Sequence, residues 1–269
     1  MKLLLLFLIL FSPGELKKHT QQLASKSRDT CSQNLYVAQD YVIKECTNYG
    51  LKIKKQSMLI QGKECRNIIA WRKGKNKDKI VIIGAHLDSY NGPGADDNAS
   101  GSACLLLLAK RFNFKTKCTI VFQWYTGEEQ GLLGSKFYAK HPLLPEDNPD
   151  IEKHIFMLNL DMVGRLQTYP RKDDVQDILE KLFPKYPFAK GITFQGSQES
   201  DQASFKQKGL PVVWLFTGTH QDYHRATDTP EKLNYEGMDM ICDYAFEIII
   251  RIMDDKIPSY ILWQLPEKP

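Results

Sequence analysis

Residues 118–135 read CTIVFQWYTGEEQGLLGS, an apolar run followed by a glycine-bounded turn that carries two adjacent acids. The apolar run has the length and residue types of a buried strand. The turn places Glu128 and Glu129 at the carboxyl end of that strand, where open α/β sheets bind their ligands. Because adjacent side chains in a tight turn can diverge, one glutamate can hold a metal while the other handles a proton.

Strand-like and helical segments alternate along the rest of the chain. Strands are expected near residues 58–60, 66–72, 79–85, 118–125, 155–161, 192–194 and 212–216, and helices near residues 32–48, 99–112, 173–183, 201–208 and 235–253. The run at 79–85 is apolar on both faces, which is typical of a central strand. This alternation predicts an α/β fold with a mostly parallel sheet covered by helices on both faces. No repeat or clear linker divides the chain, so residues 15–269 are expected to form a single domain.

The composition is that of an ordinary globular protein. The 269 residues are 25% charged and 42% hydrophobic, and the formal net charge is +4. The lysines are scattered and form no basic stripe interleaved with aromatic residues. The sequence therefore predicts no nucleic-acid partner.

The N-terminal residues have the pattern of a secretory signal. Lys2 precedes an apolar core of about ten residues, which is too short to span a bilayer. Ser12 and Gly14 are small residues at the two positions that a signal peptidase inspects. We therefore expect residues 1–14 to be a signal peptide, the mature protein to be periplasmic or secreted, and no stable membrane insertion. The alternative is a retained N-terminal anchor.

The six cysteines are widely spaced, and no C-x-x-C pair indicates a zinc knuckle or a redox dithiol. Cys31 and Cys46 bracket the helix expected at 32–48, so they would lie roughly 20 Å apart, too far to bridge. Export would permit disulfides, but the spacing identifies none. Most of these cysteines are interpreted as small core residues.

Possible metal ligands follow the predicted strands. Five successive segments at strand exits each carry a histidine or an acid: His86, Asp97 beside Asp96, Glu128 with Glu129, Asp161 and His224. Two histidines with three carboxylates suit zinc, with manganese or cobalt as substitutes. Five ligands exceed the needs of one catalytic zinc, but with a shared aspartate they suit two metals about 3.5–4 Å apart.

Each of these residues also has a simpler interpretation. His86 alone could be a core histidine, and Asp96 and Asp97 could cap a helix. His220 competes with His224 as a ligand, although no acid near it in the sequence is placed to orient its ring.

Five motifs in order carry a family resemblance. They are His86-Leu-Asp-Ser89, Gly94-Ala-Asp-Asp-Asn-Ala-Ser-Gly101, Gly127-Glu-Glu-Gln-Gly-Leu-Leu-Gly-Ser135, Asn159-Leu-Asp-Met-Val-Gly164 and Tyr223-His-Arg-Ala-Thr-Asp-Thr229. Over about residues 30–253 the chain resembles the di-zinc aminopeptidases related to bacterial leucyl aminopeptidase and glutamate carboxypeptidase II. The resemblance implies a phosphorylase/hydrolase-like α/β fold with a mixed sheet. It also implies two zinc ions per chain and hydrolysis of the N-terminal bond of peptides with a free N-terminus.

The same resemblance implies residue roles. Asp97 would bridge two zincs, His86 and Asp161 would complete one site, and Glu129 and His224 the other. The general base would be Glu128, while Asp88 would orient His86 and Asp228 would assist His224. Tyr223, Gln202 and Arg165 are the candidates for substrate binding, although Gln202 stands where the family often has histidine in a Ser-Asp-His motif.

Three relatives of this fold offer alternatives. A glutaminyl cyclase would use a single zinc, but the motifs around Asp97 and Asp161 are more similar to those of the peptidases. The second alternative is a binding module that has this fold but no metal, as in transferrin receptor ectodomains. Such a module would lack metal ligands that are present here. An aminoacylase-like carboxypeptidase would need an inserted dimerisation domain of roughly one hundred residues, and the chain has no room for it. The sequence leaves the oligomeric state open.

Overall fold

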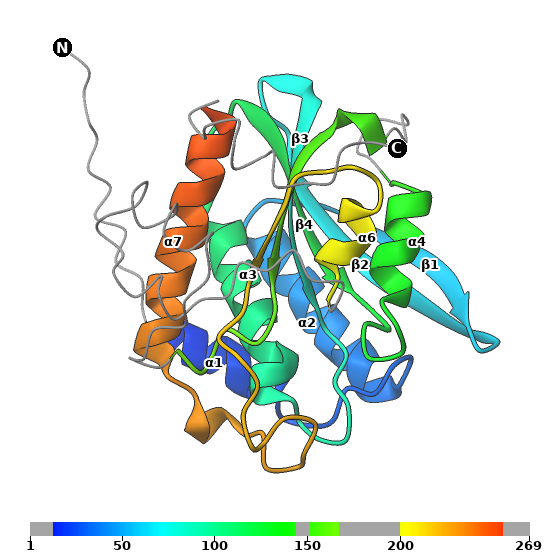
Figure 1. Ribbon diagram of the computed structural model, residues 1–269, viewed down its shortest axis with the longest axis vertical. Coiled ribbons are helices and arrows are strands. Elements are labelled where there is room, and N and C mark those ends of the chain that lie inside the picture. Colours follow the sequence, from blue (N-terminus) through cyan, green and yellow to red (C-terminus); the bar gives the residue numbers. More distant parts are fainter. Residues whose placement is uncertain (1–12, 144–150, 167–199, 255–269) are drawn as a thin grey trace.

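The computed structural model describes residues 13–143, 151–166 and 200–254 (Figure 1). The helix expected at 173–183, the strand expected at 192–194 and residues 1–12 of the expected signal peptide lie outside these ranges. Within them, no helix combines the length and the apolar character needed to cross a membrane.

The described strands form one six-stranded sheet in the order β1-β2-β4-β3-β5-β6. Strands β3 to β6 are parallel, whereas β2 runs antiparallel to both β1 and β4. The predicted α/β class with a mostly parallel sheet is therefore confirmed. The strand bounds are β1 (Lys52–Ile60), β2 (Lys63–Arg72), β3 (Asn76–His86), β4 (Cys118–Tyr125), β5 (His154–Leu160) and β6 (Val212–Leu215).

Strands β3 and β4 lie at the centre of the sheet. All eight residues of β4 are buried, as are the last seven of β3. A strand buried on both faces cannot alternate polar and apolar residues, and this explains the continuous apolar runs in the sequence.

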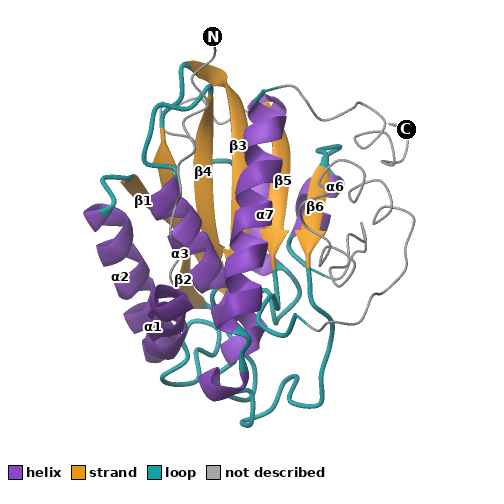
Figure 2. Cartoon of the chain, turned by 90° about the vertical axis from the view of Figure 1, so that its left-hand side faces the viewer, coloured by secondary structure: helices purple, strands orange, loops and turns teal. Residues whose placement is uncertain are grey.

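Helices cover both faces of the sheet. Figure 2 shows α1 (Pro13–Leu23), α2 (Gln33–Asn48), α3 (Gly101–Arg111) and α7 (Tyr235–Met253) on one face. On the other face lie α4 (Leu133–Lys140) and α6 (Gln202–Lys206), whose Tyr138 and Phe205 pack against the sheet. Three short helical segments complete the described elements: η1 (Ala95–Ser100), η2 (Ile151–Lys153) and η4 (Pro230–Lys232).

Local sequence explains where the main helices begin. The side chain of Ser32 accepts a hydrogen bond from the amide of Leu35 at 3.2 Å and caps α2. Asn234 caps α7 in the same way through the amide of Gly237 at 2.9 Å. Helix α1 was not among the predicted elements, and it starts at Pro13, so the expected cleavage after Gly14 falls in its first turn.

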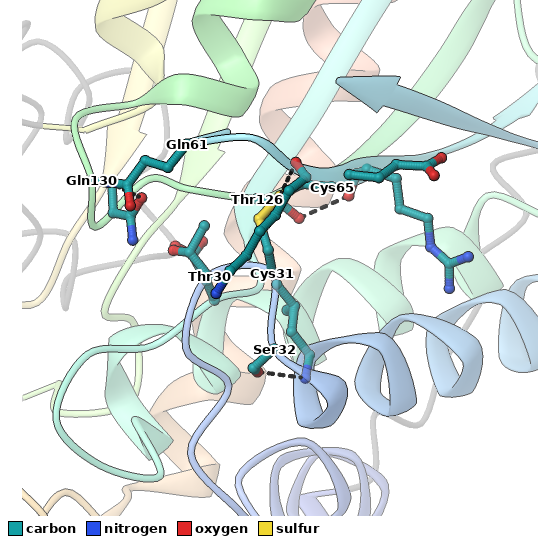
Figure 3. The surroundings of a disulfide bond; sticks show 12 residues. Thr30, Cys31, Ser32, Gln61, Cys65, Thr126 and Gln130 are labelled. Atoms are coloured by element: carbon teal, nitrogen blue, oxygen red, sulfur yellow. Dashed lines mark hydrogen bonds between the residues drawn. A yellow bond between two sulfur atoms is a disulfide. The ribbon is translucent and has the colours of Figure 1, made fainter. Parts of the chain in front are cut away.

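The cysteines divide into two groups. Cys46, Cys104, Cys118 and Cys242 lie outside the disulfide and are buried, as expected of small core residues. Cys31 and Cys65 instead form a disulfide with their Cα atoms 5.3 Å apart (Figure 3). Spacing did not identify this pair, because only the fold brings β2 beside the segment that precedes α2.

Candidate metal centre

The candidate ligands gather where the carboxyl ends of the parallel strands meet. His86 ends β3, Glu128 and Glu129 follow β4, and Asp161 follows β5. The loop after β6 supplies His224. Asp97 also follows β3, so four strand exits supply the cluster and not five. The crossover that puts β4 and β5 on opposite sides of β3 opens the crevice in which such sheets bind ligands.

The chain around Asp97 is held in an irregular turn. Gly94 has a φ of 53°, and a Cβ there would stand 2.1 Å from the carbonyl oxygen of Asp97. The side chain of Asn98 donates to the carbonyl of Leu160 at 2.9 Å and accepts from the amide of Gly101 at 2.9 Å. These contacts leave the Asp97 carboxylate free to face the histidines and tie its loop to the end of β5.

The turn after β4 separates the two glutamates. Gly127 and Gly131 have positive φ values of 81° and 102°, which glycine adopts readily. Oε2 of Glu128 lies 4.0 Å from Nε2 of His86, while Oε2 of Glu129 lies 3.0 Å from Nε2 of His224. The adjacent acids therefore face different histidines.

Asp97 stands between the two histidines. Its Oδ1 lies 3.2 Å from Nε2 of His86, and its Oδ2 lies 3.1 Å from Nε2 of His224. His86 Nε2 also lies 3.3 Å from Oδ1 of Asp161. Two donors bonded to one tetrahedral zinc at about 2.0–2.1 Å would lie roughly 3.3 Å apart, so these spacings suit donors that share an ion.

Asp88 lies beside Nδ1 of His86, the ring nitrogen that does not face Asp97 and Asp161. Nδ1 of His86 lies 3.1 Å from the backbone carbonyl oxygen of Asp88, and 3.7 Å from Oδ1 of its carboxylate. That carboxylate accepts hydrogen bonds from the hydroxyl of Thr30 at 2.8 Å and from the amide of Glu128 at 3.3 Å. The carbonyl of Asp88 is thus the group in hydrogen-bond reach of the ring, and its carboxylate links neighbouring parts of the site.

Asp228 contacts the Asp97 turn. Its Oδ2 accepts from the amides of Asp96 and Asp97 at 2.9 and 3.1 Å, and its Oδ1 lies 3.6 Å from Nη2 of Arg165. In the part of the chain that the structure describes, no hydrogen bond or ion pair joins Asp228 to His224. Asp228 therefore holds the backbone that carries Asp97.

An acid that is distant in the sequence lies beside His220. Its Nε2 lies 3.1 Å from Oδ2 of Asp96, and its Nδ1 accepts from the amide of Asp222 at 3.2 Å. Asp96 also accepts from the amide of Gly164 at 2.6 Å. Asp96 and His220 are 124 residues apart, so only the folded loop after β6 makes them neighbours.

The three substrate-binding candidates differ in position. Tyr223 is 39% exposed and stacks on His224 with ring centroids 3.7 Å apart. Arg165 lies 3.2 Å from Oδ2 of Asp222. Gln202 is fully buried and accepts from the side-chain amide of Asn159 at 2.9 Å, so its contacts are with the protein interior.

Burial and close contacts shift the pKa values of the ionisable side chains in this cluster. Desolvation, with a contribution from Asp97, raises the pKa of Glu129 to about 8, and burial raises the pKa of Glu128 well above its usual range. Burial disfavours the charged form of His86, but the carboxylates of Glu128 and Asp161 outweigh it and raise the pKa of the ring. Close contact with the carboxylate of Asp97 raises the pKa of His224. A bound cation would favour the charged form of these buried carboxylates.

The donor atoms themselves fit a metal. Nε2 of His224 and Oε1 of Glu129 are buried atoms without a partner in hydrogen-bond geometry. Two triads have ligand atoms within 4.8 Å of one another: His86 with Asp97 and Glu129, and His86 with Glu128 and Asp161. Imidazole nitrogen with carboxylate oxygen is a donor set that zinc accepts. The residues can therefore hold divalent metal.

Sequence reasoning missed several residues that support the cluster. Ser200 donates to Oδ2 of Asp161 at 2.6 Å, and the buried Asp201 beside it has a pKa raised to about 7 by desolvation. Arg28 and Thr30 reach the site from the segment between α1 and α2. Ser200 and Asp201 stand next to Gln202 in a motif that could have indicated them, whereas Arg28 and Thr30 belong to no recognisable motif.

The chain is similar to known peptidases. The family model described as peptidase family M28 matches residues 67–249. A probable leucine aminopeptidase 2 of Arthroderma benhamiae is 33% identical over 196 residues, which cover 66% of this chain and 38% of that protein. The chain thus spans well under half the length of this curated relative.

Solved structures share the fold. A Zn-dependent exopeptidase from Parabacteroides distasonis matches with a TM-score of 0.75 and 20% identity, over 89% of this chain and 98% of that one. A glutaminyl cyclase from Bacteroides thetaiotaomicron, bound to N-acetylhistamine, matches with a TM-score of 0.75 and 18% identity, over the same shares of the two chains. At these identities the likeness concerns the fold alone.

Proposed function

The chain belongs to peptidase family M28, and on that premise we propose that it is a zinc aminopeptidase that hydrolyses the N-terminal bond of peptides. The observation that carries the proposal is the position of Asp97, whose two carboxylate oxygens lie 3.2 and 3.1 Å from two different histidines. A carboxylate placed in this way can serve two neighbouring metal ions.

In this proposal the five ligands divide around Asp97. His86 and Asp161 would hold one zinc together with Asp97, and Glu129 and His224 would hold the other. Manganese or cobalt could substitute, because the donors are nitrogen and oxygen. Zinc bound there would acidify a water molecule, polarise the scissile carbonyl and accept the free α-amine of the substrate.

Glu128 is the proposed general base. Its carboxylate takes a proton from the attacking water and gives that proton to the leaving amine. Burial raises its pKa well above the usual range, which increases its affinity for the proton it must accept. The hydrogen bond from its own amide to Asp88 at 3.3 Å fixes the backbone from which it reaches His86.

The sharpest test of the exopeptidase claim uses one peptide in two forms. Leucyl peptide with a free N-terminus and its N-acetylated twin are incubated with the same zinc-loaded protein. Acetylation removes the basic lone pair of the amine and should nearly abolish cleavage. Equal rates, or cleavage inside the acetylated peptide, would refute an aminopeptidase while leaving a metal-dependent hydrolase standing.

The alternative is a glutaminyl cyclase with a single zinc, whose fold is as similar to this chain as that of the exopeptidase. Two measurements separate the two proposals. Elemental analysis should approach two zinc ions per chain, and a glutaminyl peptide should be hydrolysed, not cyclised. One zinc per chain with efficient cyclisation would establish the alternative.

We also propose that the protein acts in the periplasm or is secreted. Support comes from the disulfide between Cys31 and Cys65, because disulfides persist in oxidising compartments. Cell fractionation with N-terminal sequencing of the protein from its native host tests this proposal. A cytosolic protein with an intact Met1 would refute it.

A further inference from the structure

Residues 28–31, here called the clamp segment, run between α1 and α2 and touch the loop that joins the first two metal-ligand motifs. Arg28 is buried, and its guanidinium donates to the carbonyls of Leu87 at 2.7 Å, Pro93 at 2.5 Å and Gly94 at 3.0 Å. Its amide donates to the hydroxyl of Ser89 at 2.9 Å. Through these hydrogen bonds Arg28 fixes the loop between His86 and Asp97.

Within the clamp segment, Thr30 makes the contact that lies nearest to the proposed base and metal ligands. Its hydroxyl donates to Oδ2 of Asp88 at 2.8 Å. The other oxygen of that carboxylate accepts from the amide of Glu128 at 3.3 Å, and the Asp88 carbonyl lies 3.1 Å from Nδ1 of His86. Because Asp88 is fully buried, its carboxylate depends on such donors to stay in place.

The disulfide anchors this contact. Thr30 is held by Asp88, and Ser32 by the first turn of α2. Cys31 between them is bonded to Cys65 of β2 (Figure 3). Strand β2 pairs with β4, whose end carries the two glutamates. The clamp segment is therefore tied to the same strands that present the site, although it lies outside the residues 67–249 that the family model matches.

We propose that the clamp segment sets the position of Asp88, with Thr30 as a positioning residue for Glu128 and His86 and the Cys31–Cys65 disulfide as its anchor. The kinetic part of this inference rests on the proposed peptidase function. The effect on metal affinity does not, because it follows from the orientation of His86 alone.

The hydroxyl of Thr30 is the group to remove. Thr30→Val keeps the side-chain shape but leaves Oδ2 of Asp88 without its donor. We expect about a tenfold lower zinc affinity and, at saturating zinc, about a tenfold lower kcat, the lower end of what loss of an outer-shell partner does. KM should change little, because the hydroxyl of Thr30 is directed to Asp88. Thr30→Ser retains the hydroxyl and should restore both quantities.

The anchor is tested by a double variant, Cys31→Ser with Cys65→Ser. It should lower zinc affinity and kcat in the same direction as Thr30→Val, and Thr30→Val should add little when introduced into it. Ser25→Ala is the matched control. It removes a hydroxyl that precedes the clamp segment and donates to the carbonyl of Gln22 at 3.0 Å, and it should leave both quantities unchanged.

The experiment uses the full chain with zinc as the probe. Zinc dissociation constants are measured by competition with a chromophoric chelator, and kcat and KM are measured on leucine p-nitroanilide. A selective loss in Thr30→Val that Thr30→Ser restores supports the clamp. Wild-type zinc affinity and wild-type kcat in Thr30→Val overturn it, and so does an equal loss in Thr30→Ser.

Failure of the proposed function is distinguishable from failure of the clamp. If the wild-type protein binds zinc but cleaves no aminoacyl substrate, the peptidase proposal fails. The zinc dissociation constants of the Thr30 variants still test whether the clamp segment positions Asp88. If Thr30→Val does not fold, the double cysteine variant decides it instead. In that case an unchanged zinc affinity in a folded double variant overturns the inference.

Discussion

Glu128 and Glu129 are neighbours in the sequence, yet they face different histidines at 4.0 and 3.0 Å. The division arises in the backbone, because the two flanking glycines allow a tight turn from which adjacent side chains diverge. The proposed base, Glu128, and the proposed metal ligand, Glu129, are therefore consecutive residues with different surroundings.

Two conservative substitutions should separate these roles. Glu128→Gln should keep zinc bound and lower kcat by about 10²-fold or more, because the amide cannot accept the proton. Glu129→Gln should instead weaken zinc binding by about tenfold or more, because it replaces a charged ligand with a neutral amide. Zinc titration and steady-state kinetics on both variants make the comparison.

The exposed neighbour Gln130 provides the control. Gln130→Ala removes a side chain whose described contact is a 3.5 Å interaction with Gln61, and it should change neither zinc affinity nor kcat. If Glu128→Gln turns over at the wild-type rate, Glu128 is not the base.

Zinc affinity should depend on pH through the same residues. In the metal-free protein the pKa of Glu129 is raised to about 8 and those of His86 and His224 are raised above the ordinary value for histidine. Glu129 therefore holds a proton at neutral pH, and both histidines bind protons more tightly than an ordinary histidine, so zinc must displace these protons to bind. The affinity should therefore rise from pH 6 through pH 8 and level off above the raised pKa values.

Competition titrations at several pH values in non-chelating buffers measure this dependence. The number of protons released on zinc binding, obtained by calorimetry in buffers of different ionisation enthalpy, should fall as the pH rises. A constant zinc affinity between pH 6 and 8 would contradict the prediction.

At the scale of elements, α7 is the longest described helix on its face of the sheet, and it contributes an apolar side to the core. Its sequence has the helical spacing that predicted residues 235–253, and the structure confirms these bounds. Ile249 of this helix is fully buried, whereas Met240 on the same helix is 41% exposed.

Truncation of these two side chains should have unequal effects. Ile249→Ala should lower the free energy of unfolding by about 2–5 kcal/mol, because it removes buried methyl groups and leaves a cavity. Met240→Ala should change it by less than about 0.5 kcal/mol. Urea denaturation of metal-free protein measures both, and similar values for the two variants would show that α7 does not pack as described.

At the scale of the whole molecule, the Cys31–Cys65 disulfide joins positions 34 residues apart and closes a loop that contains α2 and β1. A crosslink of this length restricts the unfolded chain. In the chain-entropy account, its removal should lower the free energy of unfolding by about 3–4 kcal/mol.

Denaturation of the double variant Cys31→Ser with Cys65→Ser measures this loss. A reducing agent should lower the stability of the wild-type protein towards that of the variant and should leave the variant unchanged. If the reduced and oxidised wild-type proteins unfold at the same denaturant concentration, the disulfide does not stabilise the chain.

The sequence alone was sufficient for the fold class and for the composition of the candidate centre. Apolar runs such as residues 118–125 are local signals, because burial on both faces requires continuous apolar residues. The candidate ligands can also be identified from local sequence, since each stands directly after a strand or in a short motif. The parallel arrangement of strands then brings His86, Glu129 and Asp161 to one edge of the sheet.

Only the tertiary structure decided which distant groups meet around that centre. Thr30 and Asp88 are 58 residues apart, Cys31 and Cys65 are 34 apart, and Asp96 and His220 are 124 apart. None of these pairs leaves a periodic or spaced pattern, because a hydrogen bond or a disulfide depends on where two backbones approach and on where each side chain points. Sequence periodicity reports which face of an element is buried, but it carries no information about the partner that a polar group on a connecting segment will find.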